Sequence, residues 1–173
     1  KPKGLEYATT NTFDALNRLV SVTNALGDTT RFEYDANNNL RHQYTPAAAA
    51  NGDNHVEYTY DRLNRKTAHI QHKAAGNLTT LLAYDANGNL TQITDAKGQI
   101  FTNQYDDLNR LSTQTYPAGG DIETIVTQYD ANNNVAQITE NKTASIIETT
   151  TNTYDLLDRL IGVTQRGHSI NYQ

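Results

Sequence analysis

The feature of this sequence that most constrains its fold is an aromatic residue followed by Asp, which recurs seven times. The pairs are Phe13-Asp14, Tyr34-Asp35, Tyr60-Asp61, Tyr84-Asp85, Tyr105-Asp106, Tyr129-Asp130 and Tyr154-Asp155. Successive pairs are 21, 26, 24, 21, 24 and 25 residues apart, and Tyr172 stands where a further unit would begin. Repeats of this length indicate a stack of equivalent supersecondary units, none of which buries its apolar face alone.

Two further positions align with the aromatic–Asp pair. Six residues after the aromatic residue stand Leu19, Leu40, Lys66, Leu90, Leu111, Val135 and Leu160, which are apolar except for the lysine. Four residues after it stand Asn17, Asn38, Asn64, Gly88, Asn109, Asn133 and Asp158. Gly, Asn and Asp are the residue types that tolerate positive φ. We therefore predict a left-handed backbone conformation at all seven of these positions.

The pattern predicts one β-hairpin per repeat. A short strand leads into the aromatic residue, as in residues 30–34, and a second strand leaves from the apolar residue, as in 90–94. Between them the Asp opens a tight turn, in which its carboxylate accepts backbone N–H groups. A second turn, often marked by glycine, leads to the next repeat (Gly27, Gly52, Gly76, Gly98, Gly119 and Gly167). The predicted fold is all-β, with repetitive antiparallel β-hairpins forming one continuous sheet over residues 1–173.

The turns after the aromatic–Asp pairs alternate between two types. Four contain Leu-Asn-Arg or Leu-Asp-Arg, at residues 16–18, 63–65, 108–110 and 157–159. Three are Asn-rich, at residues 37–39, 87–89 and 132–134. The structural unit is then a pair of hairpins, with double steps of 47, 45 and 49 residues. We predict that the two turn types lie at opposite edges, or in different environments, of one sheet.

Composition indicates a thin sheet with much polar surface. Hydrophobic residues make up 36% of the chain and charged residues 19%, with a net charge of -5 and 11 Tyr. The scattered acidic charge disfavours nucleic acid as a partner, and no apolar run reaches the roughly 18–20 residues that span a membrane. The absence of Met predicts a piece of a longer protein, with any signal peptide outside it. Residues 46–52 are expected to form a surface loop within the array.

The candidate chemistry is structural. Catalysis needs one special constellation, whereas seven equivalent Tyr-Asp pairs indicate architecture, so we expect no catalytic residue, metal or cofactor. The arginines four residues after an Asp are expected to pair with it or to stack on a neighbouring Tyr (Arg18, Arg65, Arg110 and Arg159). Two alternatives are calcium in the Asn-rich turns, which offer one Asp each, and a metal at His69 and His72, which face opposite sides of a strand.

Stretches such as residues 105–111 and 84–90 resemble the Rhs/YD-repeat family, and the resemblance runs from about Thr9 to Gln173. The family includes bacterial Rhs proteins, the B and C components of insecticidal toxin complexes, and animal teneurins. The resemblance implies a sheet that spirals into a hollow shell around a C-terminal toxic domain. The family's self-cleaving core contains Asp-Pro, but here the three prolines follow Lys1, Thr45 and Tyr116, so no cleavage residues carry over.

The resemblance implies a structural segment of a secreted or cell-surface protein, whose partners are the rest of its shell and a toxin cargo. The first alternative is an extracellular repeat module that binds carbohydrate or a partner protein through aromatic and Asn-lined faces. The second is a glycan-active enzyme, which the sequence supports least. Unpaired strands at the ends of the array also predict end-to-end self-association of the isolated chain.

Overall fold

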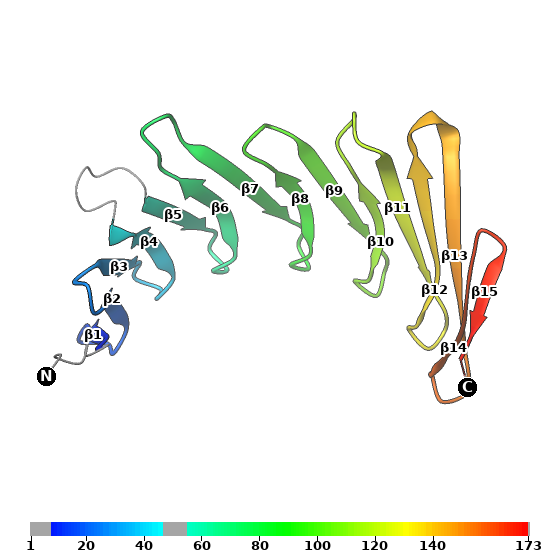
Figure 1. Ribbon diagram of the computed structural model, residues 1–173, viewed down its shortest axis with the longest axis horizontal. Coiled ribbons are helices and arrows are strands. Elements are labelled where there is room, and N and C mark those ends of the chain that lie inside the picture. Colours follow the sequence, from blue (N-terminus) through cyan, green and yellow to red (C-terminus); the bar gives the residue numbers. More distant parts are fainter. Residues whose placement is uncertain (1–7, 47–54, 173) are drawn as a thin grey trace, which may run out of the picture. The chain divides into compact units, whose positions relative to one another are not determined.

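The computed structural model describes residues 8–46 and 55–172, and it is an antiparallel β-structure throughout (Figure 1). Hydrogen-bonded neighbours follow one another in chain order in a 15-stranded sheet. The strands are β1 (Thr10–Phe13), β2 (Leu19–Thr23), β3 (Thr29–Tyr34), β4 (Leu40–Tyr44), β5 (His55–Tyr60), β6 (Lys66–Gln71), β7 (Leu78–Tyr84), β8 (Leu90–Thr94), β9 (Ile100–Tyr105), β10 (Leu111–Thr115), β11 (Ile122–Tyr129), β12 (Val135–Lys142), β13 (Ile146–Tyr154), β14 (Leu160–Gln165) and β15 (His168–Asn171). A 3-10 turn, η2 (Thr143–Ser145), joins β12 to β13. The prediction of an all-β fold of antiparallel hairpins is confirmed.

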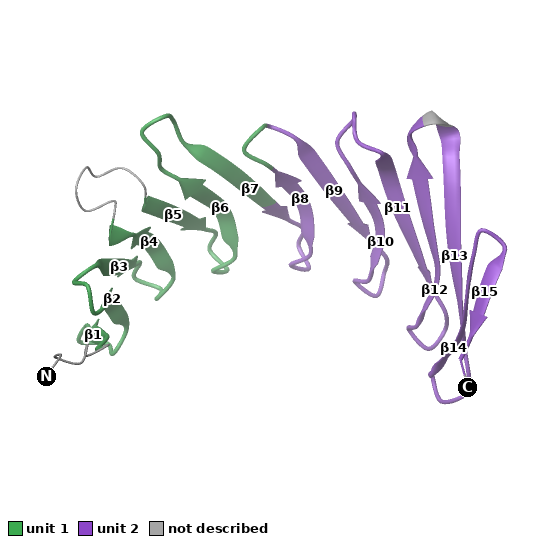
Figure 2. Ribbon diagram, viewed as in Figure 1, with its two compact units in different colours: residues 1–82, 95–97 green, residues 83–94, 98–173 purple. Residues whose placement is uncertain are grey.

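The chain divides into two compact units (Figure 2). Unit 1 comprises residues 1–82 and 95–97, and unit 2 comprises residues 83–94 and 98–173. Unit 1 thus holds β1 to β6 and most of β7, while unit 2 holds β8 to β15. The single array over residues 1–173 stays a prediction. The loop expected at residues 46–52, with its Gly52, falls almost entirely on residues 47–54, outside the described part of the chain.

Every turn that follows an aromatic–Asp pair joins an odd-numbered strand to the next even-numbered one. Because neighbouring strands are antiparallel, such turns return to the same edge of the sheet, which we call the YD edge of each unit (Figure 1). Both turn types occur there, in unit 1 after β1 and β3 and in unit 2 after β9 and β11. The predicted placement of the two types at opposite edges is therefore wrong. Each repeat contributes two strands, so between one Asp turn and the next the chain runs to the opposite edge and returns.

Successive hairpins separate at the YD edge. Strand β3 pairs with β2 only from Arg31↔Ser21 to Thr29↔Thr23, so Leu19 at the start of β2 lies beyond the ladder. Inside the hairpin, β3 instead pairs with β4 up to Tyr34↔Leu40, after a β-bulge at Tyr34. The same arrangement recurs where β8 meets β9 and where β10 meets β11. Backbone groups beside these gaps need partners other than the neighbouring strand.

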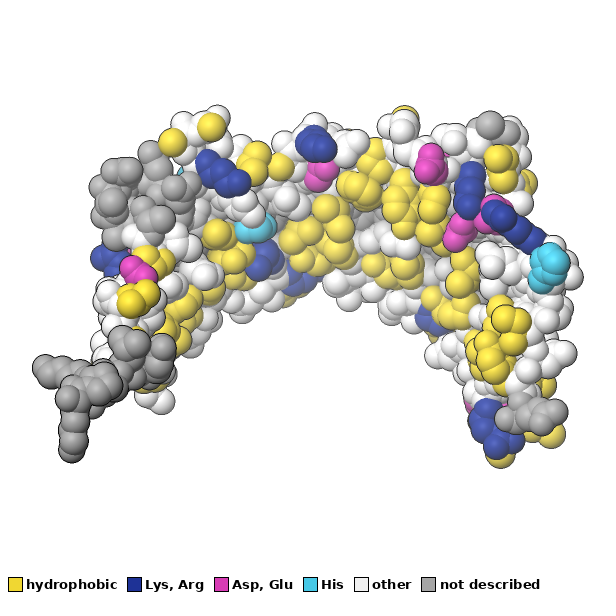
Figure 3. All heavy atoms as spheres, viewed as in Figure 1, with side chains coloured by type: hydrophobic (Ala, Val, Ile, Leu, Met, Phe, Trp, Pro, Cys, Tyr) yellow, Lys and Arg dark blue, Asp and Glu magenta, His cyan; other side chains and the backbone are white. Residues whose placement is uncertain are grey.

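The sheet is a single layer without a hydrophobic core of its own in the described residues. Ala68 is the one buried apolar side chain there, at 5% exposure, and the repeated aromatic residues and the leucines six positions after them are mostly half-buried. Leucines at the turns are exposed, as at Leu16 (68%) and Leu108 (67%). Figure 3 shows hydrophobic side chains at the surface of each unit. Stability in this fold must come largely from the hydrogen-bonded ladder and from cross-strand side-chain contacts.

Candidate functional site

The repeated Asp forms the same turn in all seven repeats. Asp14 Oδ1 accepts hydrogen bonds from the backbone N–H groups of Leu16 and Arg18, each at 2.9 Å. The backbone N–H of Asp14 donates to the Arg18 carbonyl at 3.0 Å, and that of Asn17 donates to the Asp14 carbonyl at 3.0 Å. Equivalent backbone bonds close the turns that begin at Asp35, Asp61, Asp85, Asp106, Asp130 and Asp155. The predicted Asx-type turn is thus the repeating element of the YD edge.

The third residue after each Asp has the left-handed conformation that its residue type predicts. The φ values are 60° at Asn17, 69° at Asn38, 60° at Asn64, 92° at Gly88, 59° at Asn109, 77° at Asn133 and 59° at Asp158. At this φ the Cβ atom of most residues crowds the following carbonyl oxygen, whereas Asn and Asp offset the cost with local polar contacts. Six of the seven positions nevertheless carry a side chain. Asn and Asp are found here in place of glycine because their side chains have a second role, as hydrogen-bond acceptors.

The fourth residue after the Asp donates backwards to that Asp and, in five of the turns, forwards to the left-handed residue of the next turn. Arg18 Nε donates to Asp14 Oδ2 at 2.7 Å, and Arg18 Nη1 donates to Asn38 Oδ1 of the next turn at 2.9 Å. In the other turn type, Asn39 Nδ2 donates to Asp35 Oδ2 at 3.0 Å and to Asn64 Oδ1 of the next turn at 2.8 Å. The left-handed residue is therefore also the acceptor that ties its turn to the preceding one.

We call the turns with arginine at this position Arg-type (residues 14–18, 61–65, 106–110 and 155–159) and those with asparagine Asn-type (35–39, 85–89 and 130–134). Each arginine forms an ion pair with the Asp of its own turn. Asn89 and Asn134 repeat the contacts of Asn39, reaching Asn109 Oδ1 and Asp158 Oδ1. The alternation thus changes the donor side chain while the edge and the turn geometry stay the same.

The tyrosine hydroxyl explains why the aromatic residue is so often Tyr. Tyr34 Oη donates to the Leu19 carbonyl at 2.9 Å, across the gap where β2 and β3 have separated. The same bond joins Tyr60 to Leu40, Tyr105 to Leu90, Tyr129 to Leu111 and Tyr154 to Val135, at 2.8–3.0 Å. The acceptor is always the residue six positions after the aromatic residue of the preceding repeat. This bond satisfies a carbonyl that the strand ladder no longer reaches.

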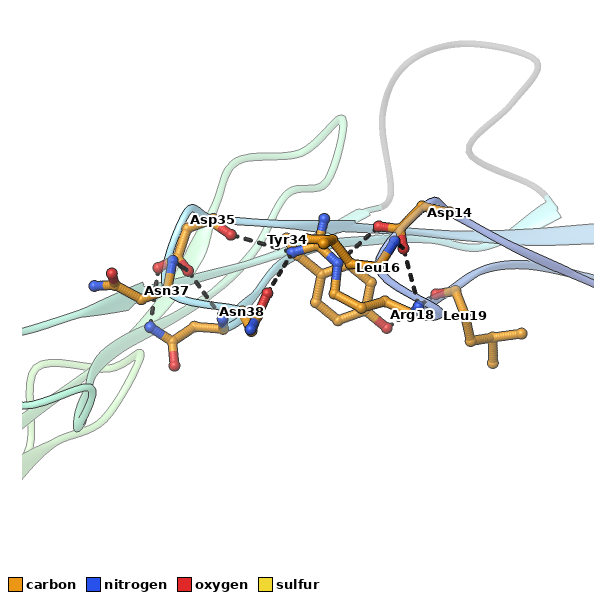
Figure 4. Close-up of polar contacts among 9 residues, drawn as sticks. Asp14, Leu16, Arg18, Leu19, Tyr34, Asp35, Asn37 and Asn38 are labelled. Atoms are coloured by element: carbon orange, nitrogen blue, oxygen red, sulfur yellow. Dashed lines mark hydrogen bonds and ion pairs between the residues drawn. The ribbon is translucent and has the colours of Figure 1, made fainter.

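Arginine also stacks on the tyrosine of the next repeat. The Arg18 guanidinium lies 4.8 Å from the centroid of the Tyr34 ring, and its Nη1 contacts the Asp35 carbonyl at 3.3 Å (Figure 4). Arg110 lies over Tyr129 in the same way, at 4.3 Å. Both expectations for these arginines, pairing with Asp and stacking on a neighbouring Tyr, are confirmed at Arg18 and Arg110. An Arg-type turn therefore fills the gap that follows it.

The seven Asp carboxylates are held in the ionised form. The pKa of Asp14 is lowered, first by the backbone N–H of Arg18 and also by its guanidinium, and the pKa of Asp106 is lowered first by the Arg110 side chain. The side-chain amide of Asn39 lowers the pKa of Asp35. The pKa of each of Asp61, Asp85, Asp130 and Asp155 is lowered as well. Carboxylates with a depressed pKa and with oxygens committed to turn amides are suited to fixing a turn.

The metal alternatives gain no support from the geometry. His72 Nε2 contacts Glu57 Oε2 at 3.0 Å, whereas His69 stacks on Tyr58 with ring centroids 5.4 Å apart. Within residues 8–46 and 55–172, no three His, Asp or Glu side chains are grouped closely enough to hold a metal ion. In the Asn-rich turns the Asp oxygens already accept protein N–H groups, as at Asp35. No helix in the described part of the chain is long and apolar enough to cross a membrane.

A family model described as RHS Repeat matches residues 13–50 and 84–121. Both matched stretches begin at an aromatic–Asp pair, and each contains one Arg-type and one Asn-type turn. A search of curated proteins finds no match to this chain.

Solved toxin-complex structures have the same fold. The crystal structure of TcdB2-TccC3-Cdc42 matches with a TM-score of 0.76 and 17% identity, over 95% of this chain and 10% of the other. TcdB2-TccC3 without its hypervariable C-terminal region matches with a TM-score of 0.73 at 17% identity, over 95% and 10% of the two chains. The Photorhabdus luminescens Tc holotoxin pore matches with a TM-score of 0.72 at 18% identity, over 96% and 9%. The chain thus spans about a tenth of the length of the toxin chains it resembles.

Proposed function

Starting from a chain that carries RHS repeats in a toxin-complex fold, we propose that it is a wall segment of a hollow β-shell that encapsulates or presents a toxin polypeptide. The observation that carries the proposal is the way in which successive hairpins are linked. Every described tyrosine-to-carbonyl bond joins one repeat to the preceding one. Such links extend a sheet repeat by repeat.

The single-layer construction supports a wall. A globular domain buries one face of each sheet against another layer, whereas this sheet has one buried apolar side chain in its described residues. Apolar side chains at turn tips, such as Leu63 and Leu157, are exposed and available for contact with other protein. In a shell, one face of the wall is available to an enclosed polypeptide and the other to solvent.

The same proposal assigns the chain a structural, non-enzymatic role in a secreted or cell-surface protein. Its partners are the remainder of its own repeat shell and a toxin cargo. The solved toxin-complex structures support this proposal because they share the fold. The uniform turn chemistry at the repeated Asp residues supports it through the site.

Electron cryomicroscopy of the full-length protein that contains this chain tests the proposal. We expect a closed β-wall around additional density, and protection of a C-terminal polypeptide from added protease until the wall is unfolded. An open array with no enclosed density would contradict it. So would specific retention of the protein on a glycan array, which would favour the carbohydrate-binding alternative.

A further inference from the structure

Gaps between successive turns at the YD edge differ according to the turn that precedes them. After an Arg-type turn the guanidinium enters the gap, as Arg110 does when it lies over Tyr129 and contacts Asn133 Oδ1. After an Asn-type turn the shorter side chain reaches only the next turn, as Asn89 does at Asn109 Oδ1. A guanidinium therefore occupies the gap after the Arg110 turn, and none lines the gap after the Asn89 turn.

The gap after the second Asn-type turn is an open pocket of about 480 Å³ in unit 2. It is lined by residues of β8, β9 and both flanking turns (Asp85, Asn87, Asn89, Thr91, Asn103, Gln104, Tyr105, Asp106, Asp107 and Asn109). An equivalent pocket of about 410 Å³ follows the first Asn-type turn, in unit 1, between Asp35 and Asp61. The two pockets occupy the same place in the repeat, after the first and the second Asn-type turn.

The unit 2 pocket offers groups that a guanidinium needs. Three carboxylates line it and no Lys or Arg does, although Asp85 and Asp106 already accept hydrogen bonds within their own turns. Asp107 is exposed and has no hydrogen-bond or ion-pair partner among the described residues, and the Tyr105 ring carries no cation from that part of the chain. The unit 1 pocket differs because Arg41 and Arg62 line it and offset its acidic side chains. Amide oxygens and a tyrosine complete a site for a planar cation.

We propose that the pocket between Asp85 and Asp106 binds the arginine side chain of another polypeptide. The incoming guanidinium takes the place that Arg18 and Arg110 take in their own gaps, over the tyrosine ring and against the edge of the next turn. Asp107 supplies the opposing charge. Arginine is favoured over lysine because a flat, delocalised cation stacks on tyrosine and donates several hydrogen bonds from a fixed fork. The site requires no enclosed cargo and is independent of the shell proposal.

Titration of the 173-residue chain with acetyl-Gly-Arg-Gly-amide, followed by NMR chemical shifts, tests this site. The matched probe replaces arginine by citrulline, which keeps the shape and removes the charge. We expect shifts at Tyr105, Asp107 and Asn109, and binding about 10-fold weaker for the citrulline peptide, since charge and stacking contribute together. Equal binding of the two peptides, or shifts that avoid these residues, would overturn the proposal.

Substitution of Asn89 by arginine supplies the missing guanidinium from within the chain. Asn89→Arg should fold, because arginine stands at this position in four of the seven turns, and it should abolish arginine-peptide binding. Asn39→Arg makes the same change beside the unit 1 pocket and should leave that binding intact. Asp107→Asn should weaken binding about 10-fold without affecting stability. Unchanged peptide affinity in both Asn89→Arg and Asp107→Asn would refute the site. The site would also be refuted if the only effect of the peptide were to dissociate dimers of this chain.

Discussion

The turns at the two edges of this sheet differ in how uniform they are. At the YD edge every turn has the same backbone bonds, a left-handed residue at the same position and the same Asp acceptor. At the opposite edge the turns vary, from an Asn24 turn with Gly27 in a left-handed conformation to the Pro117–Gly120 segment and the 3-10 turn η2. Hairpins remain paired at that second edge, as at Thr23↔Thr29, so its turns need only reverse the chain.

The difference between the edges shows where the residue types of the repeat are restricted. Strands of successive hairpins have separated at the YD edge, so side chains must connect what the backbone ladder does not. A turn that must link to both neighbours admits few residue types. A turn that lies between paired strands admits many, provided that it reverses direction. Repetition in the sequence therefore marks the edge at which the ladder is interrupted.

The largest effect on stability is expected at a left-handed residue of the YD edge. Asn109→Val places a β-branched side chain at φ 59° and removes the acceptor used by Asn87 and Asn89. We expect a loss of about 2 kcal/mol in the free energy of unfolding, measured with urea. Asn109→Gly keeps the conformation and loses only the acceptor, so it should cost about 1 kcal/mol or less. Equal losses in the two variants would mean that the conformation is not constrained.

A smaller loss is expected from the tyrosine hydroxyl, and it should depend on the edge. Tyr129→Phe removes the bond to the Leu111 carbonyl and should cost about 1 kcal/mol. Tyr116 lies at the opposite edge, where its ring meets Phe101 edge-on and its hydroxyl makes no hydrogen bond within the described residues. Tyr116→Phe should therefore be neutral. If both substitutions cost the same, the hydroxyl bonds do not distinguish the edges.

Acid should weaken the YD edge because folding lowers the pKa of its Asp carboxylates, as at Asp14 and Asp106. A depressed folded pKa contributes stability above the unfolded pKa, and that stability is lost as the pH falls through about 4 and further through the folded pKa. Melting temperature followed from pH 6 to pH 2.5 should decline steeply in the lower part of this range. Asp106→Asn should flatten the decline. A decline unaffected by Asp106→Asn would assign the acid sensitivity to other groups.

The smallest effect is expected at the turn tips. Leu108 is 67% exposed, and the equivalent position of the preceding Asn-type turn is Asn87. Leu108→Asn should change the free energy of unfolding by less than about 0.5 kcal/mol, as for other exposed positions. A larger loss would mean that the leucine packs within the isolated chain, which would weaken its interpretation as a surface that other protein covers.

Much of the turn could be predicted from the sequence because its determinants are local. Asn, Gly and Asp at one aligned position indicate positive φ, and an Asp at the start of a turn indicates bonds to amides two and four residues on. The second role of Asn38 and the hydroxyl bond of Tyr34 could not be predicted in this way. Their partners, Arg18 and Leu19, belong to the preceding repeat, and the contacts depend on strand register.

The alternation of turn types led to a prediction from the sequence that is wrong. Arg18 and Asn39 differ so much in size and charge that different surroundings were expected, yet they occupy equivalent positions and donate to equivalent acceptors. Counting two strands per repeat would have placed all the turns at one edge. The pockets after the first two Asn-type turns were missed because they lie where a side chain is too short to fill a gap, and a sequence pattern does not display gaps.

A double-mutant cycle between Arg110 and Asn133 tests the central claim, that side chains at the YD edge tie each turn to the next, most directly. Asn133→Gly removes the acceptor and keeps the positive φ, while Arg110→Ala removes the donor. The account predicts a coupling free energy of about 0.5–1 kcal/mol between the two substitutions, measured by urea unfolding. Strictly additive losses would contradict it, because successive turns would then be independent.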